Sequence, residues 1–262
     1  MQNYLIKPMK KIVFLALLQV LFVSAQSLNT VPVKVAAASD LRLALGSIAD
    51  DYFQLTGQKV QITYGSSGNF YRQIMQGGPF DLLMSADESY VQKLNDQKLT
   101  QGPGHLYAKG RIVLFIPQGA KISLDPELKD FKLALLDGRI RKVAIANPVY
   151  APYGRVAQEI LEKIGVWDKV QSQLVLGDNV AQATEFAISG NVQAGFIPFS
   201  ATYNDSVRKS GTWVVIPESL HSPILQRMAI LKGANAATQR LYDYLLQPQS
   251  QRKFQDTGFQ SP

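Results

Sequence analysis

Short apolar runs of the β-strand type alternate with helical patterns along nearly the whole chain, and this alternation restricts the fold more than any other feature. Val33 to Ala38 is predicted as a strand, and Leu41 to Leu55 then carries apolar residues at helical spacing up to Gly57. Val60 to Tyr64 is the next predicted strand. Strands that alternate with helices pair in a parallel sheet that is covered on both faces. The sequence therefore predicts an α/β fold.

The alternation continues to the C-terminus as two similar units. The further predicted strands are 81–85, 111–116, 142–146, 174–176, 194–197, 213–216 and 228–231, and the further predicted helices are 70–76, 87–94 with Asp87 as N-cap, 154–164, 180–188 and a final helix at 237–246. Two units of this kind predict two lobes. Ligands of open α/β sheets bind beyond the carboxyl ends of the strands, so we expect one site in the cleft between the lobes.

The N-terminus has the pattern of a cleaved secretory signal. Lys10 and Lys11 precede an apolar run from Ile12 to Val23, and Val23-Ser24-Ala25 is a small-residue cleavage site. The run is shorter than the roughly 20 residues of a membrane-spanning helix. We therefore predict a signal peptide at 1–25, a first lobe made of 26–113 and 226–262, and a second lobe at 114–225. Without a cysteine at the cleavage site, the mature protein is expected to be freely soluble in the periplasm.

Charge and cysteine content narrow the class further. Removal of residues 1–25 takes away Lys7, Lys10 and Lys11 and lowers the formal charge from +7 to +4. The remaining basic residues are scattered, with no run longer than 139–142, so we expect no nucleic-acid partner. The chain has no cysteine, and its core must therefore be stable without disulfides in an oxidising compartment.

Small or amide-rich residues stand at four of the predicted strand-to-helix junctions. These are Ser39-Asp40, the Gly-Ser-Ser-Gly run at 65–68, Asn147-Pro148 with the Ala-Pro-Tyr-Gly run at 151–154, and the Gly-Asp-Asn-Val run at 177–180. The first turn of a helix leaves N–H groups unpaired and carries partial positive charge. Each junction alone is equally an ordinary cap or turn. Their recurrence in both units favours an oxyanion site that needs no Lys or Arg.

At these junctions the sequence resembles the periplasmic molybdate-binding proteins of ABC transporters. The resemblance covers essentially the whole mature chain, and its motifs are Ala36-Ala37-Ala38-Ser39, Gly65-Ser66-Ser67-Gly68 with Arg72-Gln73-Ile74, Asp81 to Asp87, Asn147-Pro148 with Ala151-Pro152-Tyr153-Gly154, Asp178-Asn179-Val180 and Tyr242-Asp243-Tyr244-Leu245. It implies a two-lobe type II periplasmic-binding-protein fold, with a mainly parallel sheet flanked by helices in each lobe and the ligand in the cleft.

The resemblance also implies the ligand and its contacts. Ser39, Ser67, Tyr153 and Val180 would bind molybdate or tungstate through hydroxyls and backbone amides, and Asp40 would be the fifth contact, as in the subtype where the residue after the first-strand Ser or Thr helps to bind the anion. Pro198 stands where some members have a tyrosine. The expected protein is a monomer that delivers the oxyanion to a membrane permease, with no cofactor, no bare metal ion and no chemistry on the ligand.

Asp40 does not suit a dianion, because a carboxylate beside it is repulsive unless only the Asp40 N–H faces the ligand or the carboxyl carries a proton. We expect its side chain to point outward and stabilise the first helical turn through the dipole. The alternative is an Asp40 inside the site, which could accept the proton of hydrogen phosphate. Sulfate and phosphate therefore stay open as ligands.

Enzymatic alternatives have little support. The sequence contains no Gly-x-Ser-x-Gly elbow, no phosphate-binding Gly-x₄-Gly-Lys-Ser/Thr loop and no His-Glu-x₂-His helix. His105 and His221 are predicted in loops at the surface. A periplasmic serine hydrolase remains the alternative of another class. Tyr150 and Tyr153 could supply paired phenolates for ferric ion, but the resemblance gives that loop to an oxyanion.

Overall fold

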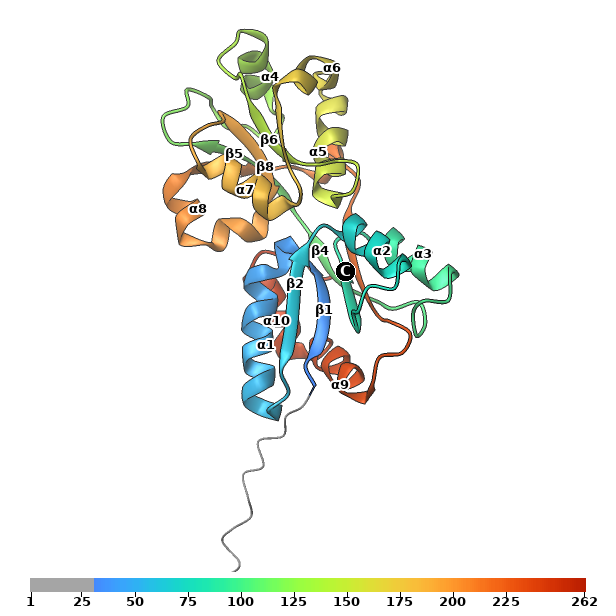
Figure 1. Cartoon of the computed structure of the whole chain (residues 1–262). Coiled ribbons are helices and arrows are strands. Elements are labelled where there is room, and N and C mark those ends of the chain that lie inside the picture. The colour runs from blue at the N-terminus through green and yellow to red at the C-terminus, as the bar shows by residue number, and fades with distance from the viewer. Residues whose placement is uncertain (1–30) are drawn as a thin grey trace, which may run out of the picture. The chain divides into compact units, whose positions relative to one another are not determined.

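The computed structural model describes residues 31–262, and the predicted signal peptide at 1–25 lies outside them. The described residues form two α/β lobes, each built on a five-stranded sheet with helices on its faces (Figure 1). The strand order is β2-β1-β3-β10-β4 in the first sheet and β7-β6-β8-β5-β9 in the second. The predicted two-lobe α/β fold is thus confirmed.

The first lobe carries the N-terminal strands and the C-terminal helices. Its strands are β1 (Val33–Ala38), β2 (Val60–Gly65), β3 (Leu82–Ser85), β4 (His105–Gly110) and β10 (Ile224–Ile230). Its helices are the short η1 (Ser39–Leu41), α1 (Arg42–Thr56), α2 (Ser67–Met75), α3 (Glu88–Asp96), α9 (Ala236–Leu245) and α10 (Pro248–Asp256). β1 pairs in parallel with β2 and β3, whereas β10 is antiparallel to both β3 and β4.

The second lobe repeats this plan. Its strands are β5 (Ile112–Pro117), β6 (Val143–Ala146), β7 (Leu174–Gly177), β8 (Ala194–Pro198) and β9 (Gly211–Val215). Its helices are α4 (Lys129–Leu136), α5 (Pro152–Lys163), α6 (Trp167–Val170), η2 (Gln171–Gln173), α7 (Val180–Ile188), η3 (Phe199–Tyr203), α8 (Asp205–Ser210) and η4 (Glu218–Leu220). β6 is parallel to β7 and β8, and β5 is antiparallel to β8 and β9.

Each sheet therefore has one reversed strand, β10 in the first and β5 in the second, and its other four strands run the same way. These two are the strands by which the chain returns to the first lobe and enters the second. Every residue of β3, β5, β6 and β8 is buried, as expected for strands with helices on both faces. The chain changes sheet between β4 and β5 and again between β9 and β10, close to the lobe boundaries predicted at 113/114 and 225/226, which stay a prediction.

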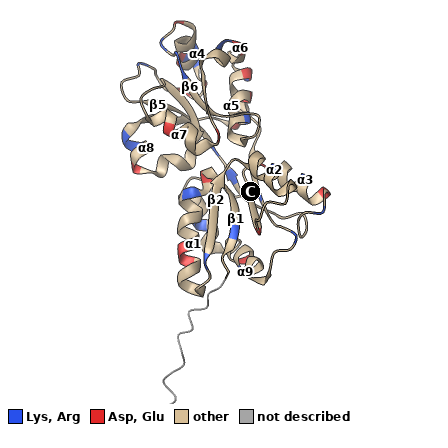
Figure 2. Cartoon of the chain, in the orientation of Figure 1, with Lys and Arg blue, Asp and Glu red and all other residues tan. Residues whose placement is uncertain are grey.

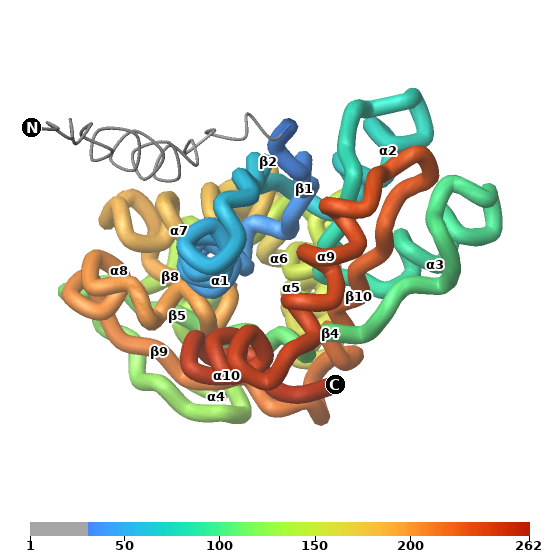
Figure 3. The backbone as a smooth tube through the Cα atoms, turned by 90° about the horizontal axis from the view of Figure 1, so that it is seen from below, coloured from blue at the N-terminus to red at the C-terminus, as the bar shows by residue number. Residues whose placement is uncertain are grey.

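Besides the short 3₁₀ turns, five elements of the described residues were not predicted from the sequence, and these are β4, α4, α6, α8 and α10. The helix predicted as the last is followed by α10, which packs beside α1 (Figure 3). Lys253 of α10 bonds Ser47 and forms an ion pair with Asp51, both on α1. α10 is largely polar, and only Ser250 and Phe254 of it are buried. Its helical form depends on this tertiary contact rather than on a clear apolar pattern.

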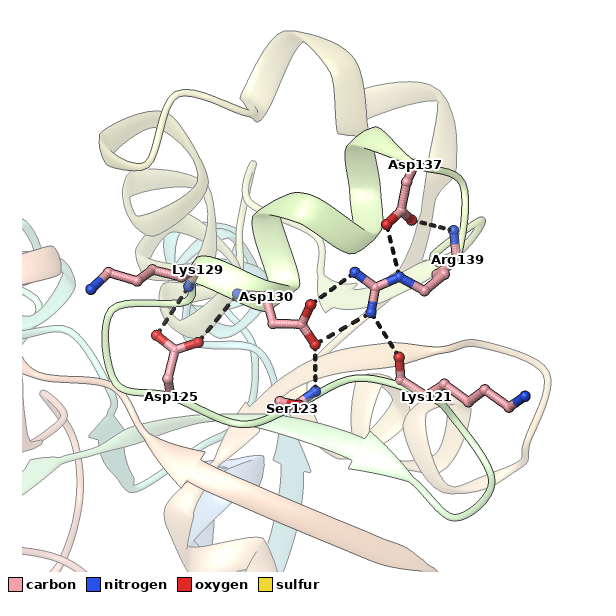
Figure 4. Close-up of polar contacts among 7 residues, drawn as sticks. All are labelled: Lys121, Ser123, Asp125, Lys129, Asp130, Asp137 and Arg139. Atoms are coloured by element: carbon pink, nitrogen blue, oxygen red, sulfur yellow. Dashed lines mark hydrogen bonds and ion pairs between the residues drawn. The ribbon is translucent and has the colours of Figure 1, made fainter.

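Charged residues lie on both lobes with the two signs interspersed (Figure 2). A network of polar contacts fixes the segment before α4 in the second lobe (Figure 4). There the Arg139 guanidinium donates to Asp130, Asp137 and the Lys121 carbonyl, and Asp125 accepts two amides of the first turn of α4. Within residues 31–262, no helix combines the length and the apolar character that a membrane crossing requires.

Candidate functional site

A small cavity lies where segments of the two lobes meet, beyond the carboxyl ends of β1, β2, β6 and β7. Its lining residues are Ala38, Ser39, Asp40, Gly65, Ser66, Ser67, Ala86, Ala151, Pro152, Tyr153 and Val180. All five residues singled out from the sequence, Ser39, Asp40, Ser67, Tyr153 and Val180, are in this set. The structure thus brings together residues that are up to 141 positions apart, while their role as ligand contacts stays a prediction.

The size of the cavity restricts what it can hold. It offers about 10 Å³ to the centre of a water-sized sphere, which is close to the space that a single water molecule needs. A sugar, an amino acid or a peptide is too large for this volume.

The serines of the Gly-Ser-Ser-Gly run point polar groups at this cavity. The Ser67 hydroxyl oxygen accepts a 2.9 Å hydrogen bond from the Ala86 amide, and only 1% of Ser67 is exposed. Because the oxygen accepts, its hydrogen is left to donate elsewhere. The Ser66 hydroxyl is buried and has no partner within the part of the chain that the structure describes. Neither side chain caps α2, so the plain N-cap alternative is wrong here.

Ser66 was missed by the sequence reasoning, which named it in the motif but gave the ligand contact to Ser67 alone. Adjacent serines in a turn carry no signal of which hydroxyl is buried. The start of α2 also differs from the prediction, at Ser67 instead of residue 70. The earlier start places the Ser67 amide in the first helical turn, where it has no intrahelical acceptor.

Ser39 follows β1 and reaches across to the second lobe. Its hydroxyl oxygen accepts a 3.4 Å hydrogen bond from the Ala181 amide at the start of α7. It makes no side-chain cap bond to its own helix. Its hydroxyl hydrogen, like that of Ser67, is therefore available to a ligand.

Backbone amides of three helix starts complete the donor set. Ser67, Tyr153 and Val180 are the first or second residues of α2, α5 and α7, and no acceptor from residues 31–262 takes their N–H groups. Asn179 caps α7 by accepting from the Ala181 and Gln182 amides, which leaves the Val180 amide free. The three helix ends add partial positive charge at the same place.

Tyr153 is a buried residue of the first turn of α5 and not a loop tyrosine. Its phenol donates a 2.9 Å hydrogen bond to Asp40 Oδ2, so only its backbone amide is free for a ligand. Burial and the nearby Asp40 carboxylate raise the pKa of this phenol well above its ordinary value of 10. The Tyr150 phenol instead donates to Asp178. The two tyrosines do not form a pair of phenolates that would hold ferric ion.

The expectation that the Asp40 side chain points outward is wrong. Asp40 is 5% exposed, and its Oδ2 accepts hydrogen bonds from Tyr153 and from Gln226 Nε2, the latter at 2.5 Å. Burial raises the pKa of Asp40 from 3.8 to about 6, although these hydrogen bonds oppose the shift. Contacts with Tyr153 and Gln226 fix the side chain, and the helix dipole alone does not decide where it points.

Two further residues support this carboxyl group. The Tyr107 phenol donates a 2.8 Å hydrogen bond to Gln226 Oε1, which directs the Gln226 amide nitrogen to Asp40. A Cβ at Gly110 would lie 2.3 Å from the Tyr153 hydroxyl, so only glycine leaves room for the cluster. Tyr107 and Gln226 belong to no motif and are 119 residues apart, so no local pattern could have identified them.

The histidines do not contribute to the cavity. His105 is the first residue of β4 and is exposed, whereas His221 is buried against the Ser222 carbonyl, which corrects the expectation of a surface loop residue. Neither lines the cavity, so the serines there have no histidine base. In the described part of the chain, no group of three His, Asp or Glu side chains is arranged to hold a metal ion.

Two more hydrogen bonds join the lobes beside the cavity, in addition to those of Ser39 and Asp40. The Gly68 amide donates to the Tyr150 carbonyl at 2.9 Å, and Arg155 Nη2 donates to Asp87 Oδ2 at 2.7 Å. Asp87 is also the N-cap of α3, as the sequence predicted. The cavity is thus bounded by direct contacts between the first and second lobes.

Known proteins are similar to this chain over most of its length. The family described as bacterial extracellular solute-binding protein matches residues 33–260. The molybdate-binding protein ModA of Azotobacter vinelandii is 35% identical over 231 residues, which cover 87% of this chain and 89% of the relative. The ModA protein of Rhodobacter capsulatus is 36% identical over 211 residues, or 79% and 80% of the two chains. The solved structure of the Azotobacter vinelandii periplasmic molybdate-binding protein superposes with a TM-score of 0.80 at 28% identity, covering 88% of this chain and 99% of that one.

Proposed function

This chain belongs to the bacterial extracellular solute-binding protein family, and we propose that it captures molybdate in the periplasm and delivers it to the membrane permease of an ABC transporter. The relatives reported above are named as molybdate-binding proteins and not as enzymes. The work of the protein is accordingly to bind and release its ligand.

The observation that carries the proposal is the convergence of unpaired donors from both lobes on one small cavity. The donors are the amides of Ser67, Tyr153 and Val180 and the hydroxyls of Ser39 and Ser67, with the buried Ser66 hydroxyl beside them. Among residues 31–262, no Lys or Arg lines the cavity. Hydrogen bonds to an ionised acceptor are stronger than neutral ones, so neutral donors alone can bind a dianion firmly. No counter-ion then has to be separated from the ligand on release.

We extend the proposal to tungstate, because an ion of the same charge and shape would use the same donors. Sulfate and phosphate offer the same kind of acceptor oxygens, so we infer that their exclusion depends on the size of the cavity. We also propose that the protein is exported with cleavage after residue 25, that it works as a monomer, and that its lobes close around the ligand through the two segments that connect the sheets.

A thermal-shift panel tests this function. A ligand that binds only the folded state at one hundred times its Kd stabilises that state by about 2.7 kcal/mol, which corresponds to a rise in Tm of about 5–10 °C for a chain of this size. We expect such a rise with molybdate and with tungstate, and a smaller one or none with sulfate or phosphate at the same concentration. A rise with sulfate or phosphate alone would contradict the proposal.

A further inference from the structure

The hydrogen bonds of Asp40 are distributed unequally over its two carboxyl oxygens. Tyr153 and Gln226 both donate to Oδ2, whereas Oδ1 is buried and has no partner from residues 31–262. Oδ1 therefore has unused hydrogen-bonding capacity in a side chain that lines the ligand cavity.

This distribution fits a neutral carboxylic acid better than a carboxylate. In the acid, one oxygen is a carbonyl that accepts hydrogen bonds and the other carries a hydrogen that must be donated. Oδ2, with two donors directed at it, suits the carbonyl. Oδ1, with none, suits the hydroxyl, and an oxyanion oxygen in the cavity would be its acceptor.

Within residues 31–262, no cationic side chain bonds the Asp40 carboxyl. The groups packed against Asp40 are the neutral phenols of Tyr153 and Tyr107, the Gln226 amide and the Ser200 hydroxyl, which donates to the Asp40 main-chain carbonyl. The backbone amides of Asp40 and Leu41 also lower the pKa of the carboxyl, but burial outweighs them. A wider cleft on the other side of Asp40 is lined by Arg42, Asp50 and Glu185. None of these three charged residues is among the groups that shift the Asp40 pKa.

We propose that Asp40 Oδ1 carries a proton in the ligand-bound protein and donates it to an oxygen of the bound oxyanion, so that molybdate binding takes up one proton. The inference rests on the proposed function. Molybdate itself has no proton at neutral pH, so the proton comes from solution. It ends on Oδ1 in a hydrogen bond to the ligand, and no covalent bond of the oxyanion is broken.

The charge of the ligand determines whether the affinity for molybdate rises or falls with pH. A dianion beside an ionised carboxylate disfavours the ionised form and raises the pKa of Asp40 further. Burial has already raised that pKa to about 6. Above this pH the free protein has to gain a proton in order to bind, and the affinity for molybdate therefore falls as the pH rises. Below about pH 6 the free carboxyl is already protonated, and the affinity should level off.

Calorimetric titration of the whole protein with sodium molybdate tests this directly. Binding is measured between pH 5.5 and 8.5, and at pH 8 in two buffers of different ionisation enthalpy, which gives the number of protons taken up. We expect about one proton per molybdate at pH 8 and a Kd that rises about tenfold per pH unit above pH 6.5.

The matched variant is Asp40→Asn, whose amide can donate to the ligand without a proton from solution and can still accept from Tyr153 and Gln226. Its proton uptake should be near zero and its Kd nearly independent of pH. Proton uptake is measured on the wild-type protein, so the proposal can still be tested if Asp40→Asn does not fold. Tight molybdate binding by the wild type with no proton uptake would overturn this inference and leave the proposed function intact. No molybdate binding at any of these pH values would overturn both.

Discussion

The two lobes share one sheet topology but offer the cavity different chemistry. η1 and α2 follow the first two strands of the first sheet, and α5 and α7 follow the corresponding strands of the second. The first lobe contributes hydroxyls, a carboxyl group and the Ser67 backbone amide. The unpaired donors of the second lobe at the cavity are backbone amides, because the Tyr153 phenol donates to Asp40 and the Asn179 side chain caps α7.

This difference shows that sheet topology and helix capping determine different features of the site. The position of a strand in the sheet determines where the next helix begins and where its first amides point. The residues around that start determine which amides stay unpaired. The Asn179 side chain accepts hydrogen bonds from two amides of α7 and leaves the Val180 amide unpaired. At the start of α5, Ala151 has no side chain that could act as a cap and Pro152 has no N–H, so the first amide of this helix is that of Tyr153. These two helix starts thus each leave an unpaired amide at the cavity by different means.

The largest expected effect on molybdate affinity comes from a substitution that prevents the two lobes from making contact. A Cβ at Gly68 would lie 2.5 Å from the Tyr150 carbonyl oxygen of the second lobe and 2.7 Å from the Tyr90 hydroxyl. We expect Gly68→Val to keep the lobes apart and to weaken molybdate binding by about a hundredfold or more, as measured by calorimetry. The control is Gly46→Val on α1, where the nearest atom is 4.0 Å away. Equal affinities for the two variants would show that this contact is not part of the bound state.

A smaller change in affinity is expected from substitutions that compare a side-chain donor of the first lobe with a backbone donor of the second. Ser67→Ala removes a hydroxyl from the first lobe and should weaken binding by about 1.5–3 kcal/mol, which is roughly tenfold to more than a hundredfold in Kd. Val180→Ala keeps the backbone amide of the second lobe and should change Kd by less than about threefold. Titration calorimetry measures both. An unchanged Kd for Ser67→Ala would remove that hydroxyl from the site.

The smallest effect concerns the ion pair between Arg155 of the second lobe and Asp87 of the first. Arg155 is nearly half exposed, so its bond to Asp87 is screened by solvent, and Arg155→Ala should raise Kd only about twofold to fivefold, mainly through faster release. Stopped-flow measurement of the dissociation rate checks this. Arg139→Ala breaks a network inside the second lobe (Figure 4) and should leave the release rate unchanged. A similar acceleration in both variants would mean that the effect is not one of lobe closure.

The local patterns of the sequence were sufficient for much of the fold. α7 begins and ends where the sequence predicts, at Val180 and Ile188, because a strand, an Asn cap and an apolar helical pattern stand next to one another. β4 and α10 were missed. Neither stands out by periodicity, and both are fixed by contacts with distant segments, β10 for the strand and α1 for the helix.

By itself the sequence determined the alternating α/β plan and the strand-to-helix junctions that contain Ser39, Ser67, Tyr153 and Val180, because strand, cap and helix signals act over a few neighbouring residues. Only the tertiary structure decided which hydroxyl is buried without a partner and where the Asp40 carboxyl points. Those outcomes depend on Gln226 and Tyr107, which the fold brings next to Asp40 from distant parts of the chain. Burial and hydrogen bonding between such segments are properties of the packed protein, and no local pattern encodes them.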